Sequence, residues 1–253
     1  MNRFEGKKAV VTGGTHGMGL AIVTALLAEG AEVVLTGRNE KTLEEARTEL
    51  KGEAAHVVRS DAASMADIAA LPDTVRKALG RVDHLFVNHG IAEFAELGEV
   101  TEESWDRQFA INTKGAFFTV QALAPLIESG GSMVFTTVAN DAILPGLSAY
   151  SASKEAMRAF AHVLAAELLP RRIRVNSVAP GFIKTPTMGV PGLTEDERRE
   201  FERQGDEMTP LKRNGTVSEV ATAALFLAAD ATFTTNVELA VDGGYAQGLV
   251  STH

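Results

Sequence analysis

The feature that most constrains the fold of this 253-residue chain is a regular alternation between short apolar runs and longer amphipathic stretches. The apolar runs are rich in β-branched residues and predict strands, whereas apolar residues at three- and four-residue spacing predict helices. The expected strands are Ala9–Thr12, Glu32–Thr36, Ala55–Arg59, His84–Asn88, Ser132–Thr137, Arg174–Val178 and Glu238–Val241. The expected helices are Met18–Glu29, Glu40–Leu50, Met65–Leu79, Glu102–Ile111, Gly115–Ile127, Ser151–Leu168 and Ser218–Ala229.

A parallel sheet covered by helices accounts for this alternation, because strands buried on both faces have continuous apolar sequences. We therefore expect an α/β fold: a single-domain, Rossmann-type doubly wound sheet of about seven parallel strands, spanning residues 1–253. One polar segment, Thr194–Glu207, follows a Pro- and Gly-rich stretch at Thr185–Gly192. This segment predicts an inserted helix, and hence a substrate lid at about 185–212.

Composition and spacing exclude several classes of function. The formal net charge of −9 disfavours nucleic acid and anionic membranes as partners, since both are bound mainly through clustered lysine and arginine. The sequence contains no cysteine, which excludes disulfides, thiolate catalysis and cysteine-type zinc sites. Met1–Val11 lacks the features of a signal peptide and no apolar run approaches a membrane span, so we expect a cytoplasmic protein. Histidines and carboxylates show no metal-ligand spacing, and the residues around Ser148 lack the last glycine of a hydrolase elbow.

A glycine-rich loop follows the first expected strand and opens the first expected helix. Its sequence is Thr12-Gly13-Gly14-Thr15-His16-Gly17-Met18-Gly19. Glycines permit a tight turn and let backbone N–H groups approach a pyrophosphate at a helix N-terminus. The loop predicts dinucleotide binding through Gly13, Thr15, His16, Gly17 and Met18, with a plain strand-to-helix turn as the alternative.

The end of the second expected strand favours NADP(H), with NAD(H) as the second choice. An acidic residue at this place in a Rossmann fold accepts hydrogen bonds from the adenosine ribose, whereas an arginine favours a 2′-phosphate. Here Arg38 follows Thr36 and Gly37, and the first acid is Glu40. The alternative for Arg38 is a solvated residue at a helix start.

Tyr150 and Lys154 lie four residues apart near the start of a long expected helix, which places both on one helix face. A free phenol has a pKa of about 10, and lowering it by about three units requires roughly 4 kcal/mol. An ammonium about 4 Å away supplies roughly that much at an effective dielectric of about 20. The pair can therefore act as an acid/base couple, although the same spacing also arises by chance on helix surfaces.

These motifs together resemble the short-chain dehydrogenase/reductase family, and in particular its NADP-dependent carbonyl and 3-oxoacyl reductases. The glycine pattern precedes Tyr150-xxx-Lys154 as in that family, and the likeness extends over essentially the whole chain. The further landmarks, in family order, are Asp61, Asn88-His89-Gly90, Asn112, Pro180-Gly181 with Thr185, and Val241-Asp242-Gly243-Gly244.

The resemblance implies a role for each matching residue. Tyr150 would donate a proton to the carbonyl oxygen while hydride leaves C4 of the nicotinamide, and Lys154 would hold the nicotinamide ribose and lower the tyrosine pKa. Asn112 would keep a water that links the lysine to solvent, or else only cross-link helices. The remaining implied cofactor contacts are Asp61 with Ala62 at the adenine, Asn88 and Gly90 along the riboses, and Pro180, Gly181, Ile183 and Thr185 facing the carboxamide, where Pro180-Gly181 could also be only a turn.

Two positions depart from the family pattern. The serine that polarises the substrate normally lies thirteen residues before the tyrosine, and this position is Thr137. A threonine hydroxyl can still donate a hydrogen bond, but its methyl group and stiffer rotamer change the pocket. Thr137 is therefore expected to be catalytic together with Asn112, Tyr150 and Lys154. His89 replaces a common alanine, either at the cofactor site or as a structural histidine.

The expected reaction moves a hydride between NADP(H) and an uncharged, mostly hydrophobic ketone or secondary alcohol. Apolar residues around the expected mouth support this substrate class, although they could equally be core: Ile91, Phe94, Ile143, Leu144, Met188, Val190, Leu193 and Met208. The alternatives are a 3-oxoacyl-thioester reductase, a non-catalytic NADP-binding sensor, and a reductase of carbon–carbon double bonds, which the compact spacing of Tyr150 and Lys154 disfavours.

The sequence also suggests partners. Wide apolar faces on Gly115–Ile127 and Ser151–Leu168 predict a homotetramer, or failing that a dimer, unless both faces only cover the sheet. Arg171, Arg172 and Arg174 form a short basic run that either docks an acidic carrier protein or is a solvated helix end.

Overall fold

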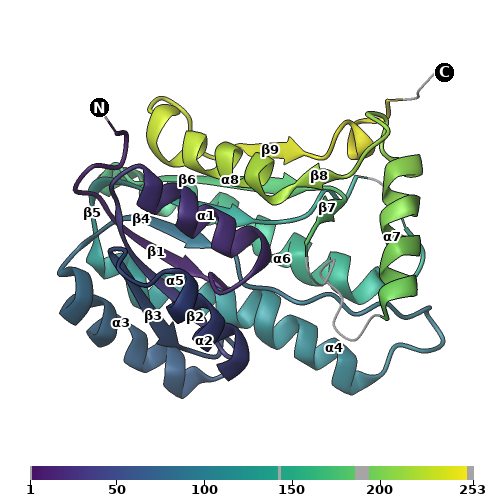
Figure 1. Cartoon of the computed structure of the whole chain (residues 1–253), viewed down its shortest axis with the longest axis horizontal. Coiled ribbons are helices and arrows are strands. Elements are labelled where there is room, and N and C mark those ends of the chain that lie inside the picture. The colour runs from purple at the N-terminus through teal and green to yellow at the C-terminus, as the bar shows by residue number, and fades with distance from the viewer. Residues whose placement is uncertain (1, 142–143, 186–193, 250–253) are drawn as a thin grey trace.

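A parallel sheet forms the centre of the protein in a computed structural model that describes residues 2–141, 144–185 and 194–249 (Figure 1). Its seven strands have the spatial order β3-β2-β1-β4-β5-β6-β9, and every neighbouring pair is parallel. They are β1 (Lys8–Thr12), β2 (Glu32–Gly37), β3 (Ala55–Arg59), β4 (Val82–Val87), β5 (Ile127–Thr136), β6 (Arg174–Pro180) and β9 (Glu238–Val241). All seven expected strands are present, and the Rossmann-type fold is confirmed.

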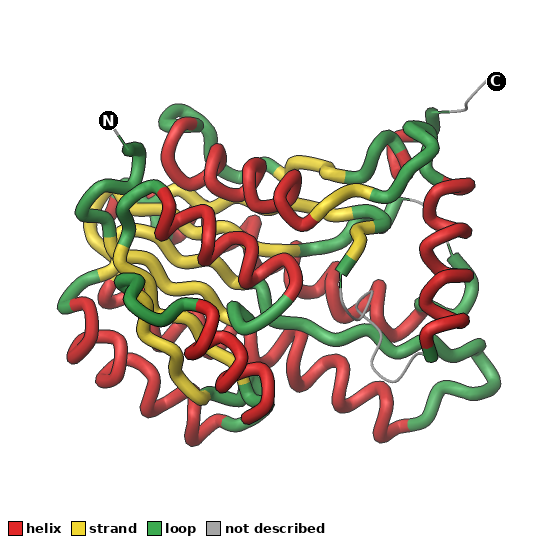
Figure 2. The backbone as a smooth tube through the Cα atoms, viewed as in Figure 1, coloured by secondary structure: helices red, strands yellow, loops and turns green. Residues whose placement is uncertain are grey.

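Helices cover both faces of the sheet (Figure 2). They are α1 (Gly17–Ala28), α2 (Glu40–Glu49), α3 (Met65–Leu79), α4 (Glu102–Phe109), α5 (Ala116–Leu123), α6 (Ser148–Glu167), α7 (Glu195–Met208) and α8 (Val217–Leu225). Helices α1 and α8 pack on one face of the sheet, and α3, α5 and α6 pack on the other. Strand β1 illustrates this sandwich: Ala9 and Val11 belong to the α1–α8 cluster, whereas Val10 belongs to the opposite one.

The chain between α4 and β5 differs from the expected helices. A π-helical turn, Ala110–Gly115, joins α4 to α5 where Asn112 uses its side chain to bind neighbouring segments. Helix α5 ends at Leu123, whereas the sequence predicted a helix up to Ile127. Pro125 lies in a 3-10 turn, Ala124–Leu126, that follows α5 and leads into β5. The expected helix was therefore too long, and Ile127 begins a strand.

The expected inserted helix is present as α7. Its N-terminus carries a capping box, in which the Thr194 side chain accepts from the Glu197 N–H and the Glu197 carboxylate accepts from the Thr194 N–H. Two short strands that the sequence did not suggest, β7 (Ile183–Lys184) and β8 (Gly215–Thr216), pair in parallel on either side of this insertion. The lid role of 185–212 remains a prediction, and part of this segment lies outside the described residues.

Candidate active site

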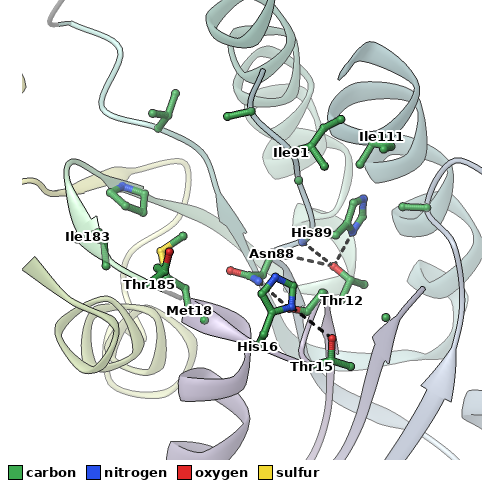
Figure 3. A pocket seen from close by; sticks show the side chains of 18 of the residues that line it. Thr12, Thr15, His16, Met18, Asn88, His89, Ile91, Ile111, Ile183 and Thr185 are labelled. Atoms are coloured by element: carbon green, nitrogen blue, oxygen red, sulfur yellow. Dashed lines mark hydrogen bonds between the residues drawn. The ribbon is translucent and has the colours of Figure 1, made fainter. Parts of the chain in front are cut away.

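A cavity of about 750 Å³ opens at the carboxyl ends of the central strands (Figure 3). Its position matches the general rule for doubly wound sheets, because β1 and β4 are neighbours at the point where the strand order reverses. All the predicted cofactor-binding residues except Lys154 line this cavity: Gly13, Thr15, His16, Gly17, Met18, Arg38, Asp61, Ala62, Asn88, Gly90, Tyr150, Pro180, Gly181, Ile183 and Thr185. Fold and cavity thus bring together residues that are up to 172 positions apart, from Gly13 to Thr185.

The glycine loop is packed so closely that side chains are excluded. Gly13 has a φ of +63°, and a Cβ there would lie 2.8 Å from the Cα of His89. A Cβ on Gly19 would lie 2.0 Å from the carbonyl oxygen of Gly13. Asn88 holds the loop in place, because its Nδ2 donates to the Gly13 carbonyl at 3.1 Å and its Oδ1 accepts from Thr136. The loop leads into α1, whose first turn contains no acidic residue, so a bound phosphate meets no like charge there.

His89 combines the two roles that the sequence left open. It lines the cavity, and its Nδ1 lies 2.7 Å from the Thr12 hydroxyl, which also accepts the backbone N–H of Asn88 (Figure 3). Burial first, and the nearby Lys154 charge second, lower the pKa of His89 to about 4, so the ring is neutral at pH 7. The ring therefore braces β1 against β4 without adding charge to the cavity.

One corner of the cavity is built by the end of β2 and the first turn of α2. Arg38 is half exposed there, with its guanidinium 3.9 Å from the Asp61 carboxylate. Thr15 and Thr42 hydroxyls lie 3.1 Å apart, and Asn39 caps α2 by accepting from two backbone N–H groups. Asn39 and Thr42 line the cavity but were missed from the sequence, although the Asn cap before an acidic helix start was a visible signal.

Tyr150 and Lys154 both project from the start of α6. Tyr150 lines the cavity, whereas Lys154 lies behind it with 4% of its surface exposed, and its Nζ donates to the Thr136 carbonyl at 2.9 Å. Burial raises the pKa of Tyr150 to about 12 and lowers the pKa of Lys154 to about 8. From the sequence we expected Lys154 to lower the pKa of Tyr150, but in this structure burial shifts this pKa in the opposite direction. The phenol consequently keeps its proton at neutral pH.

Asn112 cross-links three segments. Its Nδ2 donates to the Ile91 carbonyl and to the Ser153 hydroxyl, each at 2.9 Å, and its Oδ1 accepts the Ile91 N–H at 2.8 Å. The π-helical turn around it is a feature often found at functional sites. The side chain is thus committed to structure, which matches one of the two alternatives from the sequence, and the water-holding role remains a prediction.

Thr137 lines the cavity but its hydroxyl is engaged elsewhere. It lies 2.6 Å from a carboxylate oxygen of Glu238 on β9 and 3.0 Å from the Val178 carbonyl. Glu238 was not among the residues predicted from sequence, because nothing in its local sequence indicates that it reaches β5. The catalytic role of Thr137 remains a prediction.

The wall beyond Tyr150 is largely aromatic. Phe201 of α7 lies with its ring centre 5.6 Å from that of Phe94 and 5.5 Å from that of Phe182, which in turn contacts Tyr245 at 5.1 Å. All four rings line the cavity, and so do Ile91 and Leu144 among the expected mouth residues. Ile143, Met188, Val190 and Leu193 lie outside the described residues, and Met208 is not among the lining residues. Three of these four aromatic residues were missed, because they come from segments far from the motifs.

Two of the three residues of the basic run bind backbone carbonyls. Arg171 donates to the carbonyls of Ala124 and Ile127. Arg174 donates to carbonyls at the end of the α8 region, including Leu227 at 2.6 Å. These contacts favour the helix-end alternative over docking of a carrier protein.

Two further features, a metal site and a membrane-spanning helix, were sought among the residues that the structure describes. They contain no cluster of three or more histidine or acidic side chains that could hold a metal ion. Within the same described parts of the chain, no helix has both the length and the apolar character to cross a membrane.

Comparison with known proteins places this geometry in a family. A family model described as Enoyl-(Acyl carrier protein) reductase matches residues 13–246. The chain belongs to the short-chain dehydrogenase/reductase family. This membership makes it an oxidoreductase of the kind that acts on alcohol and ketone groups with a nicotinamide cofactor.

Relatives and a solved structure match this chain over nearly its full length. An NADP-dependent (R)-specific alcohol dehydrogenase of Lentilactobacillus kefiri is 35% identical, covering 96% of this chain and 98% of its own. A 2-(S)-hydroxypropyl-CoM dehydrogenase of Xanthobacter autotrophicus is 34% identical, with the same coverage. A mutant of a Serratia marcescens short-chain dehydrogenase/reductase superposes with a TM-score of 0.87 at 27% identity, covering 96% of this chain and 99% of that one. The first two relatives are named for opposite stereochemistry, so their names do not predict the stereochemistry of this protein.

Proposed function

We propose that this protein is an NADP(H)-dependent oxidoreductase that interconverts an uncharged, mostly hydrophobic ketone and its secondary alcohol, with Tyr150 as the acid/base. One observation carries the proposal. The cavity that begins at the glycine loop reaches Tyr150, and the buried Lys154 lies directly behind its far wall.

The residues present fit a dinucleotide cofactor. Side chains are excluded from the floor at Gly13 and Gly19, which leaves room for a pyrophosphate beside the backbone and the N-terminus of α1. His89 is neutral. Asp61 lies beside Arg38 at the corner formed by the end of β2, where it can face an adenine. The cofactor would supply the hydride to the carbonyl carbon.

Tyr150 and Lys154 carry out the proton transfer. In reduction, Tyr150 donates its phenolic proton to the substrate oxygen, and its pKa of about 12 keeps that proton available throughout the physiological range. Lys154, charged below a pH of about 8, stabilises the tyrosinate left after the transfer. In oxidation the same groups act in reverse.

NADP(H) is the preferred cofactor because of the charge at the ribose corner. Strand β2 ends without an acidic residue, and Arg38 together with the Thr15, Asn39 and Thr42 side chains offers hydrogen-bond donors at that position. An arginine pairs well with a phosphate, whereas a carboxylate there would repel it. The relative named NADP-dependent supports the same preference.

The substrate class follows from the aromatic wall. Phe94, Phe182 and Phe201 present apolar surface, and no lysine or arginine lines the cavity except Arg38 at the opposite end among the described residues. An uncharged hydrophobic ketone is therefore favoured over an anionic one. A 3-oxoacyl thioester is the second candidate, because its acyl chain would suit the same wall.

Assembly and location are also proposals. Phe117 of α5 and Val163 of α6 are exposed on neighbouring helices, which supports self-association into a homotetramer or a dimer. The net charge of −9 and the absence of cysteine support a cytoplasmic protein without nucleic-acid partners.

The test is a titration of the purified protein with NADPH and with NADH, followed by turnover assays on hydrophobic ketones and 3-oxoacyl thioesters. Tighter binding of NADPH and its oxidation by ketones are expected. Preference for NADH would overturn the cofactor assignment alone, whereas tight NADPH binding without turnover on any compound would favour the sensor.

A further inference from the structure

Asn140 lies on the cavity wall where the chain leaves the sheet between β5 and α6. The ladder between β5 and β6 continues as far as the preceding residue, because the Ala139 N–H donates to the Pro180 carbonyl at 3.1 Å. The Asn140 side chain is partly exposed and lines the cavity. Its Nδ2 donates to the carbonyl of Ser151 at 3.1 Å, and Ser151 directly follows Tyr150 in α6. The Asn140 amide is therefore anchored beside the proposed acid/base.

Both hydrogens of the Asn140 amide have acceptors. Besides the Ser151 carbonyl, Nδ2 donates to Oε1 of Glu155 at 3.0 Å, one helical turn further along α6. Glu155 is itself held in place, because the Arg158 guanidinium donates to its other carboxylate oxygen at 3.3 Å. A primary amide has two hydrogens on its nitrogen and two lone pairs on its oxygen. The two contacts with α6 thus use the whole donor capacity of Asn140.

The same two contacts determine which way the Asn140 amide faces. In the reversed orientation its oxygen would oppose a carbonyl oxygen of Ser151 and a carboxylate oxygen of Glu155, and both of these groups only accept. Reversal would lose two hydrogen bonds, one of them to a charged group, and would create two contacts between acceptors. The amide nitrogen therefore faces α6, and Oδ1 occupies the position that remains.

Oδ1 of Asn140 is an accessible acceptor without a protein donor. Among the residues that the structure describes, none donates to it, and it is not one of the buried polar atoms that lack a partner. The cavity wall made by Phe94, Phe201 and Leu144 presents only apolar surface. In apolar pockets a few fixed polar groups orient the ligand and select it. An acceptor held in one orientation beside Tyr150 is such a group.

We propose that Asn140 is a specificity-determining residue whose Oδ1 accepts a hydrogen bond from a donor group of the substrate, close to the carbonyl that Tyr150 protonates. The substrate class is then an uncharged, hydrophobic hydroxyketone, and the product is the corresponding diol. The inference rests on the proposed function and deepens it. Hydride from the cofactor reaches the carbonyl carbon and the Tyr150 proton reaches the carbonyl oxygen, while the hydroxyl held by Asn140 is unchanged.

The selectivity follows from what each kind of substrate does to Oδ1. A hydrophobic ketone displaces water from the wall, and a ketone without a donor leaves the acceptor of Asn140 without any partner. A hydroxyketone replaces the lost water by its own hydroxyl. Sites that pair with a polar group of the substrate discriminate strongly against analogues that lack it. We expect a preference of about tenfold in kcat/KM for a substrate with a donor over a matched one without.

Phenacyl alcohol and its methyl ether provide the matched pair. Both contain the same aryl ketone next to an oxygen atom, but only the alcohol has a hydrogen to donate. The wild type is expected to prefer the alcohol about tenfold in kcat/KM, and Asn140→Leu, which keeps the approximate volume without an acceptor, should reduce this preference to within about twofold. Each preference is a ratio measured on one protein, so a general loss of activity cancels. A preference that Asn140→Leu leaves unchanged would overturn the proposal.

Glu155→Gln tests the orientation of the amide without changing Asn140. The new carbonyl oxygen is drawn to Arg158, so the new NH₂ group faces Asn140 and opposes its Nδ2. The preference for phenacyl alcohol should fall to about threefold or less, because Oδ1 is no longer held toward the cavity. Glu167→Gln changes an exposed carboxylate at the last residue of the same helix and is the matched control, which should keep the full preference.

A second measurement does not require turnover. Benzamide and its N,N-dimethyl derivative both have a carbonyl that a nicotinamide does not reduce, and only benzamide has N–H donors. Titration of the protein–NADPH complex should show benzamide bound about tenfold more tightly by the wild type and about equally with its derivative by Asn140→Leu. Equal binding of the two amides by the wild type would refute the role of Asn140. Reduction of neither phenacyl compound nor any other ketone would instead refute the proposed function, so the two failures are distinguishable.

Discussion

The two ends of the cavity are constructed differently. At the end that we propose holds the cofactor, the floor is backbone: Gly13 lies against His89, and Cβ atoms added at Gly13 or Gly19 would meet main chain. At the end that we propose holds the substrate, the wall is made of side chains from four separate segments, among them Phe94, Phe182, Phe201 and Tyr245. A backbone floor suits a cofactor that does not change, whereas side chains can be exchanged to suit different substrates.

This difference predicts three kinds of effect. Substitutions near Tyr150 should change the rate of the reaction, substitutions at the cofactor end should change the affinity for the dinucleotide, and substitutions in the aromatic wall should change only the affinity for the substrate.

The largest effect is expected at Tyr150, where both ends meet. Tyr150→Phe removes the proton donor while keeping the ring, and should lower kcat for ketone reduction by about 10²- to 10⁴-fold. Steady-state kinetics with NADPH check this, and an unchanged dissociation constant for NADPH shows that the pocket is intact. Turnover close to that of the wild type would refute the tyrosine mechanism.

The next effect concerns the ribose corner. Arg38→Asp replaces a phosphate partner by a like charge, and should weaken NADPH binding by about 10- to 100-fold while NADH binding changes much less. Fluorescence titration with both cofactors measures the ratio. Arg47→Asp, on an exposed face of α2 outside the main cavity, is the matched control. Equal loss of NADPH and NADH affinity would show that Arg38 supports the fold of the corner rather than the phosphate.

The pH dependence separates Lys154 from Tyr150. Because the pKa of Lys154 is lowered to about 8, its charge is present below that pH and is lost as pH rises, while Tyr150 remains protonated up to about 12. We expect kcat/KM for reduction to fall up to about tenfold per pH unit above 8. Lys154→Arg, which keeps its charge, should lack this decline whatever its residual rate. A flat wild-type profile between pH 7 and 10 would contradict the assignment.

The titration of Lys154 should also affect the stability of the fold. As pH rises, we expect its contribution to the free energy of unfolding to increase, whereas kcat/KM falls. The unfolded chain holds a proton on Lys154 up to the ordinary pKa of 10.5, whereas the folded chain releases it near 8, so the unfolded state binds more protons between these values. The contribution of Lys154 to the free energy of unfolding therefore rises with pH in this window. Urea unfolding of wild type and Lys154→Met at pH 7.5 and 9.5 measures the difference, and a contribution that falls with pH would contradict the burial of this lysine.

The smallest effect is expected at the aromatic wall. Phe201→Leu should raise KM for a bulky hydrophobic ketone by roughly 3- to 10-fold, which corresponds to about 1 kcal/mol of lost contact, and leave NADPH binding unchanged. Phe226→Leu is the control, because that ring is exposed. If Phe201→Leu instead changed cofactor affinity, the separation between the two ends of the cavity would not hold.

Local sequence patterns predicted the strands and the glycine loop correctly, because burial and backbone conformation at these places depend on neighbouring residues. Each of the seven strands is an apolar run that can be buried only between helices, and the glycine loop has a conformation that few other residues can adopt. The helix bounds failed where a local exception occurred: Pro125 ends α5 early, and Asn112 sits in a π-helical turn. A window of apolar spacing does not show such interruptions.

The sequence by itself determined the parallel sheet, the glycine-rich loop and the placement of Tyr150 and Lys154 on one helix face, because these depend on short-range spacing and on which residues can be buried. Only the tertiary structure decided which groups surround the side chains of Tyr150 and Thr137. Desolvation raises rather than lowers the pKa of Tyr150, and Glu238 contacts Thr137 from 101 residues away. Burial and cross-strand contacts depend on the packing of segments that are distant in the chain, so no local pattern encodes them.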